Sequence, residues 1–130
     1  MFEHGMISWT DLNTFKVEEA KAFYTSALGM EFQGFDMPQG TYWVALHGGK
    51  QAWGIQNMAG RAPEGAPSHW FTYLAVDDVD KRIAGIEALG GKVIAAPFDI
   101  PTVGRIAIVQ DASGATLGWM APENVSGSPK

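Results

Sequence analysis

The chain has 130 residues, of which 46% are hydrophobic and 18% charged, and its formal net charge is −5. This length predicts one domain that can bury a real core. The negative charge argues against nucleic acid or an anionic membrane as partner, since both favour clustered Lys and Arg. The sequence contains no cysteine, which excludes disulfides, thiolate metal ligands and a cysteine nucleophile. We find no signal-peptide pattern and no apolar stretch of about 18 residues, and therefore expect a cytoplasmic protein.

The first half of the chain predicts a strand, a helix and three short strands. Residues 6–12 have strand character, and Asn13 and Thr14 are typical of the N-cap of a helix over about 16–28. Apolar residues recur along that segment at helical spacing, and Gly29 stands where glycine usually ends a helix. Strands are then expected near 30–35, 41–47 and 51–57, with Gly48-Gly49 as a hairpin turn.

The second half repeats this order after a linker rich in Gly and Pro over 59–67. Residues 70–76 predict a strand, and Asp77-Asp78 predicts the N-cap of a helix over about 79–89. Strands are expected near 92–96, 105–110 and 115–121, the last two joined by Asp111-Ala112-Ser113-Gly114. The tail, residues 123–130, is rich in Ser, Gly and Pro and is expected to be disordered.

The two halves align with each other at an offset of 62 to 64 residues. Trp9 aligns with Phe71, Gly54 aligns with Gly118, and Phe35-Asp36-Met37-Pro38 aligns with Phe98-Asp99-Ile100-Pro101. An internal repeat of two copies predicts two half-modules that close one core. One helix to four strands in each half argues against a doubly wound parallel sheet. We therefore expect an α+β fold built as βαβββ twice, with mostly antiparallel strands.

Short motifs in both halves point to a known family. They are Asp11-Leu12, Ala22-Phe23-Tyr24, Leu28-Gly29-Met30, Leu74-Ala75-Val76-Asp77-Asp78, Gly90-Gly91-Lys92-Val93 and Asp111-Ala112-Ser113-Gly114-Ala115. In their order, spacing and duplication the chain resembles the glyoxalase/bleomycin-resistance/dioxygenase (vicinal oxygen chelate) superfamily over about residues 5–122. The resemblance implies one glyoxalase-like domain over 1–122 whose two tandem modules, about 5–58 and 68–122, form a cup-shaped mixed sheet.

The resemblance also implies where a metal would be bound. Metal-dependent members carry four ligands, one on the first and one on the last strand of each module. The corresponding positions here are Trp9, Gly54, Phe71 and Gly118. Indole, phenyl and glycine offer no lone pair that divalent metals use, so we expect neither a metal nor another cofactor. The family's strand order further predicts Trp9 beside Gly54 and Phe71 beside Gly118, each ring covering the bare glycine backbone.

The cup face in this register carries the candidate site residues. We predict Asp11 as a general base and Tyr73 as a donor to a ligand oxygen, which makes them the candidate catalytic pair. A helix-entry role for Asp11 and a backbone hydrogen bond for Tyr73 are the structural alternatives. The predicted ligand-binding residues are Trp9, Gly54, Gln56, His69, Phe71, Gly118 and Met120.

Two other groups of polar residues are candidates for a site. His4, His47 and His69 lack the short spacing of a shared metal site. Arg105 is a candidate partner for an anionic ligand, with Asp99 or Asp36 as the ordinary alternative.

Two functions follow from the resemblance and the residues. The first is a metal-free glyoxalase/bleomycin-resistance-like protein that binds an apolar or aromatic small molecule in the cup. The second is a lyase, isomerase or dioxygenase of the glyoxalase type, which would need ligands from the histidines or cofactor-free chemistry on Asp11 and Tyr73. The family resemblance also implies a homodimer.

Overall fold

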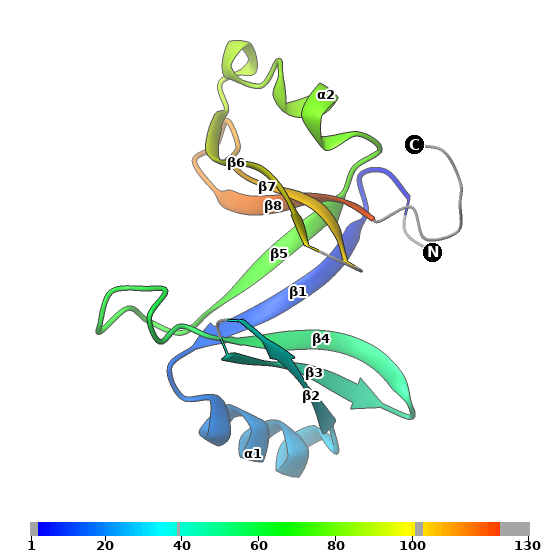
Figure 1. Ribbon diagram of the computed structural model, residues 1–130, viewed down its shortest axis with the longest axis vertical. Coiled ribbons are helices and arrows are strands. Elements are labelled where there is room, and N and C mark those ends of the chain that lie inside the picture. Colours follow the sequence, from blue (N-terminus) through cyan, green and yellow to red (C-terminus); the bar gives the residue numbers. More distant parts are fainter. Residues whose placement is uncertain (1–2, 39, 101–102, 123–130) are drawn as a thin grey trace. The chain divides into compact units, whose positions relative to one another are not determined.

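The computed structural model describes residues 3–38, 40–100 and 103–122 (Figure 1). The chain divides into two compact units. The first, called here the α1 unit, is Trp9–Phe71, and the second, the α2 unit, comprises the described residues within Met1–Ser8 and Thr72–Lys130.

The elements of the two halves follow the same order along the chain. The first half contains β1 (Ile7–Thr14), α1 (Val17–Leu28), β2 (Glu31–Met37), β3 (Gly40–His47) and β4 (Lys50–Asn57). The second half contains β5 (His69–Ala75), α2 (Val79–Ile83), the 3₁₀-helix η1 (Glu87–Leu89), β6 (Lys92–Ile100), β7 (Gly104–Gln110) and β8 (Thr116–Pro122). The predicted α+β class and the repeated βαβββ order are confirmed.

Each half forms a mixed sheet that is mostly antiparallel. In the first half the strand order is β2-β3-β4-β1, and in the second it is β5-β8-β7-β6. β1 pairs with β4 in parallel, and β5 pairs with β8 in parallel, whereas the other pairs within each half are antiparallel. The first strand of each module therefore lies beside its last strand, as expected.

Helix α1 covers one face of its sheet (Figure 1). The predicted N-cap at Asn13 and Thr14 is wrong, because α1 begins after Lys16, which makes no side-chain capping bond. Thr14 Oγ1 instead accepts a hydrogen bond from the Lys16 backbone N–H at 3.0 Å. The end of the helix is as predicted: Gly29 has φ 73°, and its N–H donates to the Thr25 carbonyl oxygen.

The core of the α1 unit lies between this helix and the sheet. Leu12, Val17 and Ile55 are buried there, and partly buried apolar and aromatic side chains surround them: Ala20, Tyr24, Phe32, Trp43 and Trp53. Because side chains alternate between the two faces of a strand, the residues next to Leu12 and Ile55, namely Asp11 and Gly54, lie on the opposite face.

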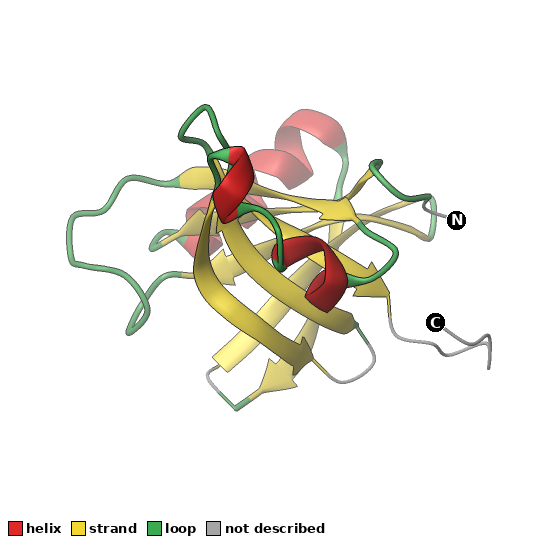
Figure 2. Cartoon of the chain, turned by 90° about the horizontal axis from the view of Figure 1, so that it is seen from above, coloured by secondary structure: helices red, strands yellow, loops and turns green. Residues whose placement is uncertain are grey.

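The second helix is shorter than the sequence pattern predicts. The expected helix over 79–89 is divided into α2, a turn over 84–86 and η1 (Figure 2). Gly85 lies in that turn, and a glycine inside a helix costs about 1 kcal/mol relative to alanine. Gly90 ends η1 with φ 95°. The core of the α2 unit is a buried cluster of Val76, Val79, Ile86, Ala107 and Val109.

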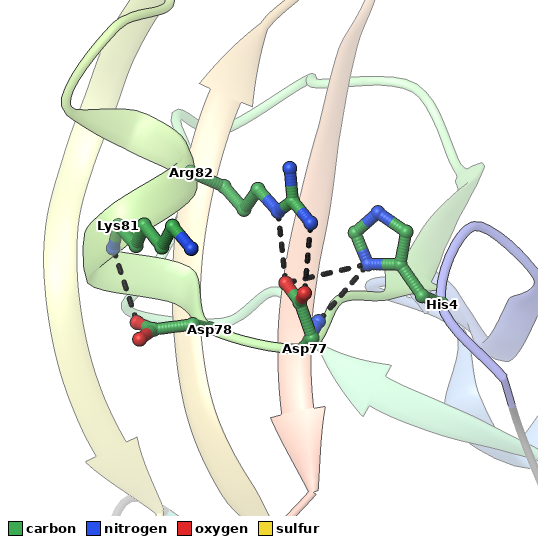
Figure 3. Close-up of polar contacts among 5 residues, drawn as sticks. All are labelled: His4, Asp77, Asp78, Lys81 and Arg82. Carbon is green, nitrogen blue, oxygen red and sulfur yellow. Dashed lines mark hydrogen bonds and ion pairs between the residues drawn. The ribbon is translucent and has the colours of Figure 1, made fainter.

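The start of α2 is held by carboxylates (Figure 3). Asp78 accepts a hydrogen bond from the Lys81 backbone N–H at 3.0 Å, which confirms it as the N-cap. The neighbouring Asp77 binds the Arg82 guanidinium at 2.7 and 2.8 Å, and its own backbone N–H donates to His4 Nδ1 at 3.0 Å. His4 therefore contacts the segment that leads into this helix.

The predicted turn before β8 is also confirmed, because Asp111 Oδ1 accepts hydrogen bonds from the backbone N–H groups of Ser113 and Ala115 at 2.9 and 3.1 Å. The expectation of a disordered tail concerns residues 123–130, which lie outside the described residues. Across the described part of the chain, none of the helices combines the length and the apolar character that a bilayer crossing demands.

Candidate functional site

Asp11 is a buried carboxylate on the sheet face opposite α1. Its exposed fraction is 4%. The Tyr42 hydroxyl donates to Asp11 Oδ1 at 2.5 Å, and the Trp9 indole N–H donates to the same oxygen at 3.0 Å. The indole N–H also lies 2.7 Å from the Tyr42 hydroxyl oxygen. Trp9 and Asp11 on β1 and Tyr42 on β3 thus form a connected group, which together with Gly54 on β4 is called here the Asp11 cluster.

Gly54 makes this arrangement possible. Its Cα partners are Asp11 on β1 and Val44 on β3, so it lies between the strands that carry the carboxylate and the phenol. A Cβ atom at Gly54 would overlap the Tyr42 hydroxyl and would lie 2.5 Å from Asp11 Oδ1. The missing side chain is therefore the space through which Tyr42 reaches Asp11.

The predicted pairing of Trp9 with Gly54 is wrong by two residues. Asp11, not Trp9, is the register partner of Gly54. A shift of two residues keeps every side chain on its face, so Trp9 still lies on the same side of the sheet as Gly54. The ring that covers Gly54 is that of Tyr42 on β3, not that of Trp9. Gly34 is likewise covered by a ring of β3, because a Cβ there would lie 2.9 Å from the ring of Trp43, its register partner.

The environment of Asp11 changes its acidity. Burial raises the pKa of the Asp11 carboxyl above its ordinary value. The hydrogen bonds from Tyr42 and Trp9, and the positive charge of Arg61, oppose this rise because they favour the ionised form. Asp11 is thus a carboxylate that takes up a proton more readily than an exposed one, and its role as a general base stays a prediction.

The remaining candidates of the α1 unit lie on β4 and β5. Gln56 pairs with Asn13 of β1 in the register that places Asp11 beside Gly54. His69 is exposed, and its Nδ1 lies 3.1 Å from the Pro67 carbonyl oxygen, so this ring contacts the linker. Phe71 is half-buried. Their roles as ligand contacts stay predictions.

The candidates Tyr73, Gly118 and Met120 belong to the α2 unit. The predicted pairing of Phe71 with Gly118 is wrong by the same two residues, because the register partner of Gly118 is Tyr73. The Tyr73 carbonyl oxygen accepts a hydrogen bond from the Ser8 hydroxyl at 3.3 Å. Met120 pairs with Ala75 of β5 and Ile106 of β7. The catalytic role of Tyr73 stays a prediction.

Tyr42 is the site residue that the sequence reasoning missed. The predicted face contains residues of the first and last strands of each module only, and Tyr42 lies on β3. The signal was present in Thr41-Tyr42-Trp43, because a Trp43 directed to the helix side places Tyr42 on the opposite face by simple alternation.

The residues at the four positions where the resemblance predicts metal ligands do not fit a metal. The Trp9 indole nitrogen is used as a donor to Asp11, Phe71 offers only carbon, and Gly54 and Gly118 have no side chain. Within residues 3–38, 40–100 and 103–122, no group of three or more His, Asp or Glu side chains is placed to hold an ion.

Arg105 is engaged in ion pairs on the α2 unit. Its guanidinium binds Asp80 at 2.7 Å and Asp99 at 3.0 Å. The ordinary alternative of an ion pair with Asp99 is therefore confirmed, and Asp80 is an additional partner that the sequence did not indicate.

Two curated relatives align with almost the whole chain. The protein named "Putative glyoxylase CFP32" from Mycobacterium tuberculosis is 37% identical over 127 residues, which are 95% of this chain and 49% of that protein. The anthracycline biosynthesis protein DnrV from Streptomyces peucetius is 29% identical over 145 residues, covering 98% of this chain and 53% of that protein. The chain thus spans about half the length of the curated relatives it matches.

Solved structures share the fold at low sequence identity. A hypothetical protein from Bacillus halodurans has a TM-score of 0.70 at 13% identity, covering 94% of this chain and 97% of that one. A methylmalonyl-CoA epimerase solved with methylmalonyl-CoA has a TM-score of 0.66 at 15% identity, covering 95% and 98%. The family description that matches residues 6–118 is Glyoxalase/Bleomycin resistance protein/Dioxygenase superfamily. The chain therefore belongs to this superfamily.

Proposed function

We propose that this chain binds an aromatic or apolar small molecule, without a metal, on the sheet face that carries the Asp11 cluster. The observation that carries this proposal is the pair of half-buried rings, Trp9 and Tyr42, whose polar atoms both meet on the buried Asp11. Apolar walls with a few fixed polar groups are typical of small-molecule sites. The name of the relative DnrV, which refers to the synthesis of anthracyclines and hence of aromatic compounds, is consistent with an aromatic ligand.

The metal-free part of the proposal rests on the chemistry of the side chains. Trp9, Gly54, Phe71 and Gly118 supply no ligand atom of the kind that divalent metals bind. The test is the metal content of protein purified without chelator, followed by a thermal-shift series with Ni, Zn, Mn, Fe and Mg. We expect near-zero stoichiometry and an unchanged melting temperature. One tightly bound metal that stabilises the fold by about 3 to 4 kcal/mol at excess metal would contradict the proposal and favour a metal-dependent lyase, isomerase or dioxygenase.

The binding part is tested with naphthalene-type ring compounds and a pair of tryptophan variants. We expect ring binding to be weakened by Trp9→Leu, because this ring lies on the proposed face. Trp43→Leu is the matched control, since Trp43 packs on the helix side of the same sheet. Isothermal titration gives both affinities directly. Equal affinity for the two variants and the parent would contradict the site.

A second candidate function is a cofactor-free acid–base enzyme with Asp11 as the base. The observation that favours it is the burial of Asp11, which raises the pKa of its carboxyl. Asp11→Asn separates the two functions, because it removes the base while leaving the rings of Trp9 and Tyr42 in place. If the parent protein turns over a compound and Asp11→Asn does not, while the variant still binds ring compounds, the acid–base function is favoured.

A further inference from the structure

We infer that the free carboxylate oxygen of Asp11, Oδ2, selects ring compounds that carry an O–H or N–H donor, such as a phenol, an enol or a ring N–H. This inference rests on the proposed function and names the chemical class of its ligand. The proposed function assigns the rings of Trp9 and Tyr42 to the site, and Asp11 Oδ2 would add the group that selects among ring compounds.

The two oxygens of Asp11 are used differently. Tyr42 at 2.5 Å and Trp9 at 3.0 Å both donate to Oδ1. Among the hydrogen bonds of the described residues, none ends on Oδ2. A carboxylate oxygen has two acceptor positions, so Oδ1 receives two donors, whereas Oδ2 receives none from the described residues.

Burial makes that open position costly. Asp11 is 4% exposed, and a buried acceptor without a partner is unfavourable, more so when it is charged. Arg61 acts on Asp11 through its positive charge, but the ion pairs of the described residues do not include it. A donor hydrogen on a ligand would supply the missing bond, which a purely apolar ring cannot do.

The direction of Oδ2 is fixed by the cluster. Two donors on Oδ1, which come from different strands, prevent the carboxylate from rotating about its last bond. Gly54, the register partner of Asp11, has no side chain that could turn toward Oδ2. A recognition group that is held in place before binding gives selectivity at a low entropic cost.

The experiment compares 2-naphthol with 2-methoxynaphthalene, which has the same ring but no donor hydrogen. Isothermal titration near pH 7, where the naphthol keeps its proton, gives both affinities. We expect the affinity of the wild-type protein for 2-naphthol to exceed its affinity for 2-methoxynaphthalene by about tenfold or more, which is the contribution of a hydrogen bond to a charged acceptor. Equal affinities would overturn this inference and leave the proposed function standing. Failure of both compounds to bind would overturn the two together.

The variant Asp11→Asn replaces the acceptor Oδ2 by an amide NH₂ group, which is a donor. In Asp11→Asn the amide oxygen is expected to take the Tyr42 and Trp9 hydrogen bonds, which directs the NH₂ group to the position of Oδ2. The preference for 2-naphthol should then disappear, because the amide N–H can donate to the oxygen of either compound. Asp36→Asn is the matched control, because Asp36 is exposed on β2 and accepts only from Thr41 among the described residues. A preference that survives Asp11→Asn would overturn the inference, and the wild-type comparison decides it if the variant does not fold.

Discussion

Tyr42 on β3 donates its hydroxyl hydrogen to Asp11 on β1 at 2.5 Å. The two strands are not neighbours, because β4 lies between them and presents Gly54 at the point of contact. A phenol is long enough to reach across one strand only where that strand has no side chain on the shared face. The carboxylate, the phenol and the glycine are therefore one structural unit, and the following predictions test it.

Removing the hydroxyl should destabilise the protein. Tyr42→Phe leaves the buried Asp11 Oδ1 with one donor instead of two, and a lost hydrogen bond to a buried acceptor costs about 1 to 3 kcal/mol. Urea unfolding at neutral pH measures the change. Thr41→Val is the control, because Thr41 lies next to Tyr42 and donates to the exposed Asp36 at 3.3 Å. The prediction is wrong if the two variants lose the same stability.

A methyl group at Gly54 should have a larger effect than its size suggests. Gly54→Ala places a Cβ where the Tyr42 hydroxyl lies, and overpacking of this kind costs about 1 to 3 kcal/mol. The matched control is Gly85→Ala, where a Cβ would meet no atom within 4 Å. There the variant is expected to gain about 0.4 to 1 kcal/mol, because alanine restricts the unfolded chain. Equal effects in chemical denaturation would contradict the close contact at Gly54.

The free energy of unfolding should depend on pH through the titration of Asp11. Burial raises the pKa of the folded carboxyl above the ordinary value of 3.8. Between the ordinary pKa, which applies to the unfolded chain, and the higher pKa of the folded protein, Asp11 is protonated more often in the folded state than in the unfolded state. The free energy of unfolding therefore falls as pH rises through that range. Exposed carboxylates with a lowered pKa, such as Asp77 beside Arg82, give the opposite slope at more acidic pH.

Comparison with Asp11→Asn isolates this contribution, since the other carboxylates are common to both proteins. We expect the stability of the wild type relative to the variant to decrease from about pH 4 upward and then level off above the folded pKa of Asp11. Urea unfolding over a series of pH values measures the difference. An increase with pH would mean that the hydrogen bonds from Tyr42 and Trp9 outweigh burial.

The helix cap of the α2 unit gives a prediction independent of the site. Asp78→Ala removes the acceptor for the Lys81 backbone N–H and should cost about 1 kcal/mol. Asp78→Ser keeps a capping oxygen and should retain most of the stability. Thermal unfolding followed by circular dichroism compares them. If serine and alanine destabilise equally, the side-chain cap does not contribute.

Much of the fold could be predicted from the spacing of apolar residues and from the residues that begin and end helices. The helical spacing before Gly29 gave α1, and the internal repeat gave the βαβββ order of both halves. Asp78 was recognised as a cap because its side chain acts on atoms only three residues away. The length of the second helix could not be predicted in this way, because Gly85 and the packing of Ile86 in the core determine where the helix ends. The identity of Asp11 as a candidate followed from the resemblance, but its partner Tyr42 did not.

The sequence by itself determined which face each strand residue occupies, because alternation has a period of two and a one-residue slip would move every side chain to the other side. Only the tertiary structure decided which residues on that face meet. A shift of two residues preserves the alternation, so no pattern along the chain separates Trp9 beside Gly54 from Asp11 beside Gly54. The backbone pairing of β1 with β4, and the length of the Tyr42 side chain reaching over it, settle the choice.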